Sequence, residues 1–416
     1  MRDRVIRLFW LMTDQGVFAL SNFVLNVQFA RWLSPHDYGL FAISFTGFLL
    51  LSVIHYGCLL EPLLVLSSQV GADRRGSYLM ALVHLHMLLF GSVIAVSALA
   101  FACAWGLGAS EAGWLIVGAG IGGSTNLALL TARRLCLIFL STRISALVGA
   151  VYFTGVTATS YLCILFWEVS WFAIWEIIGG WSLICASLVF GLLIARLQGR
   201  QPFALSEVLR FQVRYAPFTL IGAIGTWVTA ESIMIFLANI EGLDAVAETR
   251  VVFNLASPLV QITIAMNAFW LVGFSAKHAN REHHGIGSEA LPYVAVCVLA
   301  ALITKFAGVP VMDFLYRGKY VGVAWQLPIY CIAIGISGVT QIVTSSFKAR
   351  GLLFRGNLPQ IVCGAATLIA SFPLMEMFGQ PGAVYTNFIG NATGLCIAAL
   401  LMARSRAREA SCSRNR

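Results

Sequence analysis

Seven polar side chains stand inside or at the ends of long apolar segments, and these are the residues whose types and spacing could do chemistry. They are Asn22, Asn26, Arg31, Glu61, Arg143, Glu231 and Lys305. A charge is costly in hydrocarbon, so an ionisable residue there by default marks a transport pathway or a coupling site. No metal or cofactor site is predicted, because the ten cysteines and seven histidines show no metal-ligand or redox spacing.

The three cations predict an anion-binding site if they face one cavity. Cations in a low-dielectric setting attract anions strongly, so Arg31, Arg143 and Lys305 together would favour a phosphate or diphosphate. Each cation also has a plainer interpretation. Arg31 ends its segment as an interfacial anchor, Arg143 opens its segment as a cytoplasmic positive charge, and Lys305 reaches the outer interface by snorkelling.

The acids and amides each leave two interpretations open. Glu231 has no basic neighbour in its own segment, so it either faces an aqueous cavity, as a candidate for ion coupling, or pairs with another helix. Glu61, a second coupling candidate, precedes Pro62; the pair either interrupts its helix and lines a cavity or sits at the cytoplasmic interface. Asn22 and Asn26 share one helix face, where they line a lumen or bond to a neighbouring helix.

The composition fixes the class of protein that must position these residues. Of 416 residues, 59% are hydrophobic and only 11% are charged, with a mean hydropathy of +0.83. Soluble domains carry about 25% charged residues. A soluble enzyme, a nucleic-acid-binding protein and a secreted disulfide scaffold are therefore excluded. The long unbroken apolar runs predict membrane-spanning helices rather than the alternating strands of a barrel.

Breaks rich in glycine, proline and charge divide the chain into twelve predicted spans. They are 15–32, 39–66, 78–105, 113–132, 144–167, 172–195, 215–239, 248–271, 290–312, 322–346, 356–377 and 382–403. With both termini in the cytoplasm, 22 of the 27 basic residues fall on the cytoplasmic side, as the positive-inside rule requires. The net charge of +9 then reflects topology and contact with anionic membrane lipids, and no nucleic-acid partner is expected.

Tryptophans are expected at the opposite, outer interface, where aromatic belts form. They are Trp32, Trp105, Trp114, Trp167, Trp171, Trp175 and Trp325. The longest predicted loop, 196–215, lies at the middle of the chain, and its apolar-basic stretch 205–214 predicts an interfacial amphipathic helix. This linker would join two six-helix lobes, residues 1–198 and 199–416. Residues of the same type recur 207 positions apart, such as Phe29 and Phe236. This leaves two interpretations open, a parallel repeat of the two lobes and a chance match.

Catalysis is not expected. The sequence contains no glycine-rich phosphate loop and no nucleophile elbow, and the acids of the short outward loops are dispersed. A membrane polymerase or glycosyltransferase usually needs a substantial outward loop or domain to hold its chemistry.

Four motifs carry a resemblance to a known family. They are Asp14-Gln15 to Asn22-Phe23, then Phe29-Ala30-Arg31-Trp32-Leu33-Ser34-Pro35 to Tyr38-Gly39-Leu40-Phe41, Leu59-Leu60-Glu61-Pro62-Leu63, and Ala132-Arg133-Arg134-Leu135. They resemble bacterial polysaccharide-biosynthesis membrane proteins, the oligosaccharide-lipid flippases of the multidrug/oligosaccharidyl-lipid/polysaccharide exporter superfamily. The motifs lie in the first 155 residues, whereas the twelve-span layout covers the whole chain.

The resemblance implies an all-α fold of two six-helix lobes around a central cavity, working by alternating access in the bacterial inner membrane. The implied substrate is a polyprenyl-diphosphate-linked oligosaccharide, flipped to the periplasmic leaflet for surface polysaccharide or O-antigen biosynthesis, with polysaccharide assembly proteins as further partners. Three alternatives stay open. A cation-coupled drug or metabolite exporter of the same superfamily would show an acidic and aromatic pocket, and a membrane polymerase or glycosyltransferase would show paired periplasmic catalytic groups. A scaffold subunit for polysaccharide assembly, without transport, would show a packed interior with no cavity.

Overall fold

The computed structural model describes residues 2–61, 63, 74–196, 205–279 and 286–414, and the regular structure in these ranges is entirely helical. Contacts divide the chain into an N-terminal unit, Met1–Leu220, and a C-terminal unit, Ile221–Arg416. Each unit is described by itself. The predicted boundary between residues 198 and 199 lies outside the described residues.

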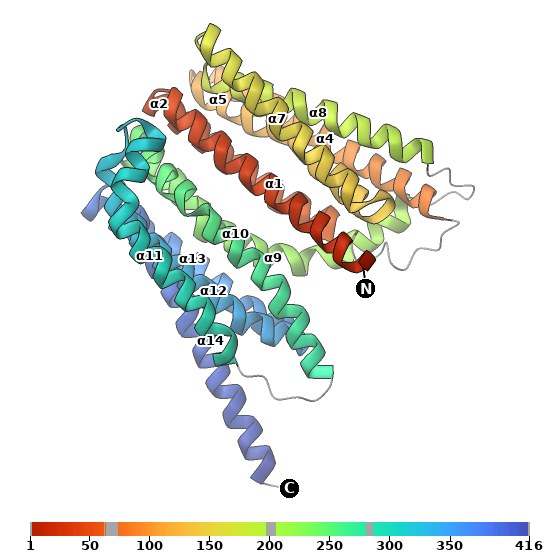
Figure 1. The fold of residues 1–416 in the computed structure, drawn as a ribbon, viewed down its shortest axis with the longest axis vertical. Coiled ribbons are helices and arrows are strands. Elements are labelled where there is room, and N and C mark those ends of the chain that lie inside the picture. Colours follow the sequence, from red (N-terminus) through yellow and green to blue (C-terminus); the bar gives the residue numbers. More distant parts are fainter. Residues whose placement is uncertain (1, 62, 64–73, 197–204, 280–285, 415–416) are drawn as a thin grey trace. The chain divides into compact units, whose positions relative to one another are not determined.

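The described part of the N-terminal unit contains six long helical segments, one of which is formed by α5 and α6 together (Figure 1). The helices are α1 (Arg2–Trp32), α2 (Pro35–His55), α4 (Arg75–Gly106), α5 (Ser110–Val117), α6 (Gly123–Leu135), α7 (Thr142–Phe166) and α8 (Trp171–Arg196). Three π-helical turns extend or join them: η1 (Tyr56–Leu60) follows α2, η2 (Gly118–Gly122) joins α5 to α6, and η3 (Cys136–Leu140) follows α6. Helix α1 packs along α7, and α6 packs against α8.

The division between the units falls within α9 (Leu205–Ile240), which continues into the C-terminal unit. The other helices there are α10 (Leu243–Ala279), α11 (Ile286–Tyr316), α12 (Leu327–Ala349), α13 (Leu353–Phe378) and α14 (Gly382–Arg414), with a 3-10 turn, η4 (Val321–Gln326), before α12. The same packing recurs in both units. In the C-terminal unit α10 contacts α12, α12 contacts α14 and α13 contacts α14. In the N-terminal unit α2 contacts α6, α6 contacts α8 and α7 contacts α8.

Eleven helical segments of the described chain are long and apolar enough to cross a membrane. Together with α1 they match the twelve predicted spans in order. Helix α1 has 31 residues but falls short in hydropathy, because it carries Asn22, Asn26 and Gln28 in its apolar part. Polar residues of a membrane helix are stable where they bond to other helices or line a cavity. Helix α1 accordingly contributes five of the fifteen residues that line the cavity described below, as many as α2.

Local sequence signals explain where the helices begin. Ser34 caps α2: its hydroxyl accepts a 3.0 Å hydrogen bond from the Asp37 backbone N–H, and Pro35 occupies the first helical position. Ser141 caps α7 in the same way, accepting from the Ile144 N–H at 3.2 Å. Gly242, with a φ of +89°, makes the sharp turn between α9 and α10.

The predicted interfacial helix over 205–214 is not a separate element. These residues are the first turns of α9, which runs without interruption through Pro217 to Ile240. Pro217 does not stop the helix, since packed neighbours can re-satisfy the carbonyl that a proline leaves free in a membrane helix. The amphipathic stretch and the seventh span are thus one helix of 36 residues.

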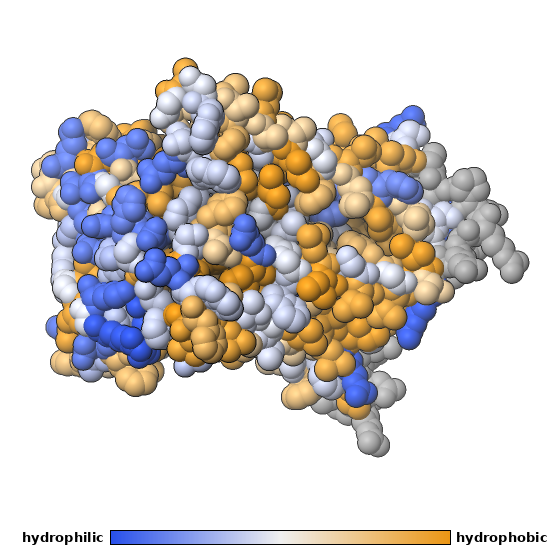
Figure 2. Space-filling view, turned by 90° about the horizontal axis from the view of Figure 1, so that it is seen from above, coloured by the Kyte–Doolittle hydropathy of each residue, from blue (hydrophilic) through white to orange (hydrophobic). Residues whose placement is uncertain are grey.

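The outer faces of the two units are apolar. Of the most apolar stretch of α4 only 6% is buried within the protein, and of that of α11 only 17%. The corresponding stretches of α5–α6 and α12 are 67% and 61% buried. Side chains such as Leu99 and Phe306 are largely exposed. Figure 2 shows broad apolar patches at the surface beside hydrophilic groups. Patches of this extent on a soluble protein would be an association surface, but on spanning helices they suit lipid.

Candidate functional site

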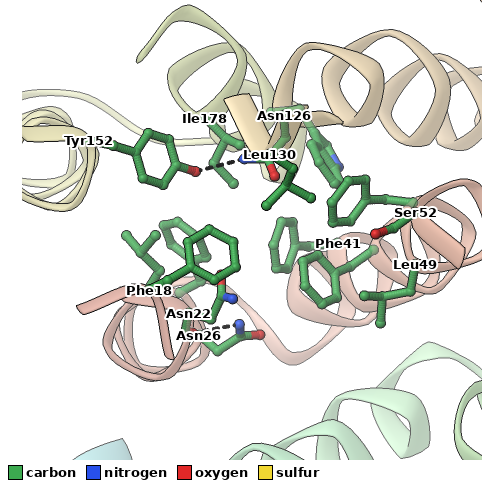
Figure 3. A pocket seen from close by; sticks show the side chains of 15 residues that line it. Phe18, Asn22, Asn26, Phe41, Leu49, Ser52, Asn126, Leu130, Tyr152 and Ile178 are labelled. Carbon is green, nitrogen blue, oxygen red and sulfur yellow. Dashed lines mark hydrogen bonds between the residues drawn. The ribbon is translucent and has the colours of Figure 1, made fainter. Parts of the chain in front are cut away.

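A cavity lies inside the N-terminal unit, between α1, α2, α6, α7 and α8 (Figure 3). Its volume is about 100 Å³. Ten lining residues are apolar: Phe18, Leu25, Phe29, Phe41, Phe45, Phe48, Leu49, Leu130, Trp175 and Ile178. Five are polar: Asn22, Asn26, Ser52, Asn126 and Tyr152. The cavity therefore combines aromatic rings with uncharged hydrogen-bonding groups, and the predicted pair Asn22 and Asn26 belongs to it.

The aromatic wall is fixed by close ring contacts. Trp175 lies 5.7 Å from Phe41 and 5.8 Å from Phe48, measured between ring centroids. Its indole N–H donates a 2.7 Å hydrogen bond to the Ser44 hydroxyl. Gly122, at the end of the π turn η2, leaves room for this ring, since a Cβ there would lie 2.9 Å from it. The indole is thus held in one orientation at the cavity wall.

Trp171 and Trp175 correct the predicted aromatic belt. Both are buried in the N-terminal unit, with 8% and 2% of their surface exposed, whereas Trp105, Trp114 and Trp167 are exposed as expected. Helix α8 begins at Trp171, so one turn suffices to carry Trp175 inward among the phenylalanines of α2. The sequence signal that could have found it is the run Gly118–Gly123, whose small residues admit a large ring.

The polar groups lie on two sides of the cavity (Figure 3). On one side, the Asn126 amide donates to the Tyr152 hydroxyl at 3.0 Å and to the Ser182 hydroxyl at 3.1 Å. On the other, the Asn26 amide donates to the Asn22 backbone carbonyl at 2.9 Å. The Asn22 carboxamide and the Ser52 hydroxyl make no side-chain hydrogen bond to any described residue. These two groups are therefore available to a ligand.

A buried ion pair adjoins this cavity. The Arg133 guanidinium, at the end of α6, donates to the Asp14 carboxylate of α1 at 2.8 Å, and only 6% and 1% of these side chains are exposed. The same Asp14 oxygen accepts from the Ser145 hydroxyl at 2.8 Å. The guanidinium also lies over the ring of Phe18, 4.4 Å from its centroid, and Phe18 lines the cavity.

By the positive-inside rule, Arg133 is one of the 22 basic residues on the cytoplasmic side. The structure shows a buried and neutralised side chain instead. Its partner Asp14 is 119 residues away in the chain. The one available signal was that both residues belong to motifs of the resemblance, Asp14-Gln15 and Ala132-Arg133-Arg134-Leu135.

Arg31 and Arg143 are not brought together. Arg143 is exposed and lies over the Trp10 ring at 5.7 Å, near the start of α1, whereas Arg31 is a half-buried residue in the last turn of α1. At a rise of about 1.5 Å per residue, Trp10 and Arg31 stand about 30 Å apart along the helix. The two arginines therefore occupy opposite ends of the N-terminal unit, and neither lines the cavity.

Glu231 and Lys305 belong to the C-terminal unit and differ in setting. Glu231 accepts a 2.9 Å hydrogen bond from Arg250 on α10, the cross-helix pairing that was one of its two predicted interpretations. Lys305 is exposed on α11 and shares its face with Leu302 and Val309, which are also exposed. An exposed apolar face on a spanning helix suits lipid, so this setting fits a snorkelling lysine.

Glu61 directly follows the π turn η1. Its backbone N–H reaches back five residues to the Tyr56 carbonyl, which closes η1. The Gly57 carbonyl accepts a 3.1 Å hydrogen bond from the Thr219 hydroxyl. Glu61 is half-buried, and its flanking residues Leu59 and Leu60 are buried in the apolar core of the unit. Pro62 lies outside the described residues.

Comparison with solved structures identifies the fold. The chain is similar to the lipid II flippase MurJ in an inward closed conformation, with a TM-score of 0.72 and 12% identity over 96% of this chain and 87% of that one. It is similar to the Vibrio cholerae MATE transporter VcmN, with a TM-score of 0.67 and 15% identity over 96% of both chains. It is also similar to a MOP superfamily transporter from Pyrococcus furiosus, with a TM-score of 0.66 and 13% identity over 97% of this chain and 95% of that one.

No protein-family model and no curated protein matches the sequence. At these identities the structural likeness establishes the fold, which is the multi-pass helical fold of MOP-superfamily transporters. The solved proteins named above are a flippase and two transporters. Fold alone does not choose between a lipid-linked and a soluble substrate, so that choice depends on the site.

Proposed function

We propose that the protein flips a polyprenyl-diphosphate-linked oligosaccharide from the cytoplasmic to the periplasmic leaflet of a bacterial inner membrane, for cell-surface polysaccharide biosynthesis. The observation that carries the proposal is the aromatic and amide lining of the cavity in the N-terminal unit. The fold, shared with a lipid II flippase, supports it. The orientation with both termini in the cytoplasm rests on the positive-inside distribution of the basic residues.

The lining matches the chemistry of a sugar. A pyranose ring offers a face of C–H groups, which packs on aromatic rings such as Trp175 and Phe41, and an edge of hydroxyls, which needs amide and hydroxyl partners. Asn22 and Ser52 supply such partners and have no competing side-chain bond among the described residues. A few polar groups placed in an otherwise apolar pocket give orientation and specificity.

The size of the cavity favours an alternating-access cycle. Ligand pockets commonly measure about 300–1,000 Å³, and this cavity holds about 100 Å³. A lipid-linked head group of several sugars does not fit the present state. The cavity of the described conformation is therefore too small for this head group, and the N-terminal unit has to open before loading.

Arg133 is the group we assign to the diphosphate. Its guanidinium lies on the Phe18 ring at the cavity wall and already holds an anion, the Asp14 carboxylate, at 2.8 Å. A diphosphate offers the same kind of charge-assisted acceptor with more oxygens, so it competes with Asp14 for the guanidinium. The polyprenyl chain stays in lipid, since only the charged head group pays a large penalty in hydrocarbon.

A drug or metabolite exporter is the second candidate, because MATE transporters share the fold and the cavity is aromatic. A pocket that selects cationic drugs needs a carboxylate in reach. The described residues that line the cavity include none, and the nearby Asp14 is already paired with Arg133. The lining therefore favours the neutral, hydroxyl-rich sugar part of the proposed substrate over a cationic drug.

The test is the sidedness of lipid-linked oligosaccharide in a deletion strain. The wild-type gene should restore delivery to the periplasmic leaflet, and without it the lipid-linked intermediate should accumulate on the cytoplasmic leaflet. Normal periplasmic delivery with unpolymerised product would instead indicate a polymerase. Restored resistance to cationic dyes, with no change in lipid sidedness, would indicate the exporter.

A further inference from the structure

A pair of histidines is buried in the N-terminal unit, apart from every group used above. His55 stands at the end of α2 and His86 on α4, with 1% and 2% of their surface exposed. The His55 Nε2 and His86 Nδ1 atoms are 3.2 Å apart. The Thr131 hydroxyl of α6 lies 3.1 Å from the first and 3.4 Å from the second.

We propose that His55 and His86 form a one-proton binding site that couples the transport cycle to the proton gradient. The inference rests on the proposed transport function for its role, but proton binding itself can be measured without it. Three features carry the proposal: the shared central proton, the unpartnered outer nitrogens, and the position of the pair beside the cavity.

The hydrogen bonds fix how many protons the pair holds. Thr131 donates its hydroxyl proton to the Leu127 carbonyl at 2.9 Å, so its oxygen is an acceptor for the rings. One ring proton therefore sits between His55 Nε2, His86 Nδ1 and the Thr131 oxygen. In the neutral pair the second ring proton is on one outer nitrogen, and the other outer nitrogen keeps a free lone pair.

One further proton completes the pair, and a second does not fit. Adding a proton to the free outer nitrogen gives an imidazolium that still donates through the central bond, with a net charge of +1. Another proton would place two N–H groups face to face across 3.2 Å and two positive charges side by side. The pair is thus built for a stoichiometry of one.

Both outer nitrogens lack partners. His55 Nδ1 and His86 Nε2 are buried and make no hydrogen bond to any described residue. Such groups are costly to leave unsatisfied, and a charge on them here would be costlier still. The described conformation is therefore the proton-free state, and proton binding favours a conformation in which water or a polar group reaches an outer nitrogen.

Among the described residues, no charged group is hydrogen-bonded to the pair. The titratable or charged residues on the nearby turns of the surrounding helices are Tyr56, Cys58 and Glu61 after α2, Tyr78 and His84 on α4, Arg133, Arg134 and Cys136 at the end of α6, and Cys185 on α8. Arg133 is neutralised by Asp14, and Arg134 lies over the Tyr56 ring. None of them hydrogen-bonds to either imidazole in the described chain, and no described carboxylate is hydrogen-bonded to a ring nitrogen of the pair. Occupancy by a proton is thus decided by access to water.

The pair stands one helical turn from the cavity. Ser52, which lines the cavity, precedes His55 by three residues on α2, and Leu130, which also lines it, precedes Thr131 on α6. The π turn η1 begins directly after His55, and η3 begins five residues after Thr131. π turns recur at functional sites because they let a helix shift its register locally. Movement that opens the cavity and movement that hydrates the pair therefore share two helices.

Proton binding is tested on the full-length protein in nanodiscs by titration of ¹⁵N-labelled histidine. We expect two imidazole signals to change together in one step, with uptake of one proton, and both to be altered in His55→Gln and in His86→Gln. The matched control is His84→Gln, because His84 is exposed on the same helix two residues away. Independent titration of the two rings, or no uptake by them between about pH 4 and pH 9, would overturn the site.

Coupling is tested in proteoliposomes with a fluorescent polyprenyl-diphosphate disaccharide as the probe and the membrane potential clamped. For one coupled proton, a gradient of one pH unit moves the leaflet ratio of the probe about tenfold. Wild type and His84→Gln should show this shift, Thr131→Ser should retain it, and both single histidine variants should lose it. An unchanged shift in both histidine variants would refute the coupling. If wild type moves no probe, the proposed function fails, and the titration still decides the proton site.

Discussion

The guanidinium of Arg250 donates a 2.9 Å hydrogen bond to the carboxylate of Glu231, across the interface of α10 and α9. Both side chains are largely buried, with 7% and 14% exposed. Arg250 therefore holds the place that a coupling cation would take at Glu231. This pairing leads us to place proton coupling elsewhere, at His55 and His86.

Substitution of one partner of the Glu231–Arg250 pair should destabilise the protein more than substitution of both. We expect Glu231→Gln to destabilise the protein by about 3–5 kcal/mol, because it leaves a buried guanidinium without its counterion. The double variant Glu231→Gln/Arg250→Gln should recover most of that loss. Thermal unfolding in detergent measures it, with Glu168→Gln as an exposed control. Purely additive effects of the two substitutions would contradict a coupled pair.

Replacement of Arg133 by lysine should reduce both the stability of the protein and its flipping activity. Arg133→Lys keeps the positive charge and the topology but loses the planar contact with Phe18 and the two bonds to Asp14. We expect a loss of about 1–3 kcal/mol in stability and a marked fall in flipping. Arg134→Lys is the matched control on the same helix end, and it should behave as wild type in the complementation assay. Equal flipping by the two variants would remove Arg133 from the diphosphate site.

Substitutions of residues that line the cavity should lower the apparent affinity for the substrate. Asn22→Leu removes a free amide, and Trp175→Leu removes the stacking ring, so each should raise the half-saturating substrate concentration about tenfold, equivalent to about 1.4 kcal/mol. Initial flipping rates at varied probe density measure this. Leu20→Ala alters an exposed residue of the same helix and should have no effect. A change in maximal rate alone would argue against direct contact with the substrate.

Replacement of glycine by alanine should destabilise the protein at Gly225 but not at Gly180. A methyl group on Gly225 of α9 would lie 2.9 Å from the Gln360 carbonyl oxygen of α13, a backbone contact that cannot rotate away. Gly225→Ala should therefore cost about 1–3 kcal/mol. Gly180→Ala meets nothing within 4 Å and should be neutral or gain up to about 1 kcal/mol from helix propensity. Unfolding temperatures in detergent decide the comparison, and equal shifts would contradict the close packing of α9 on α13.

The sequence by itself determined the twelve helices. Their apolar runs and their capping residues are local features, so the spans, the cap at Ser34 and the start of α7 at Ser141 could be predicted without any tertiary contact. The bounds of α9 could not, because the amphipathic stretch 205–214 has the same helical character as the span that follows it. Asn22 and Asn26 were recognisable because two amides on one face of an apolar helix need a polar setting.

Only the tertiary structure decided which polar groups meet. Asp14 and Arg133 are 119 residues apart, Glu231 and Arg250 lie on different helices, and His55 reaches His86 across 31 residues. A polar side chain in an apolar helix requires a partner, but its own helix does not say which of the other helices will supply it. Packing makes that choice, because the small residues of η2 admit the Trp175 ring and so bring α2, α6 and α8 together around the cavity.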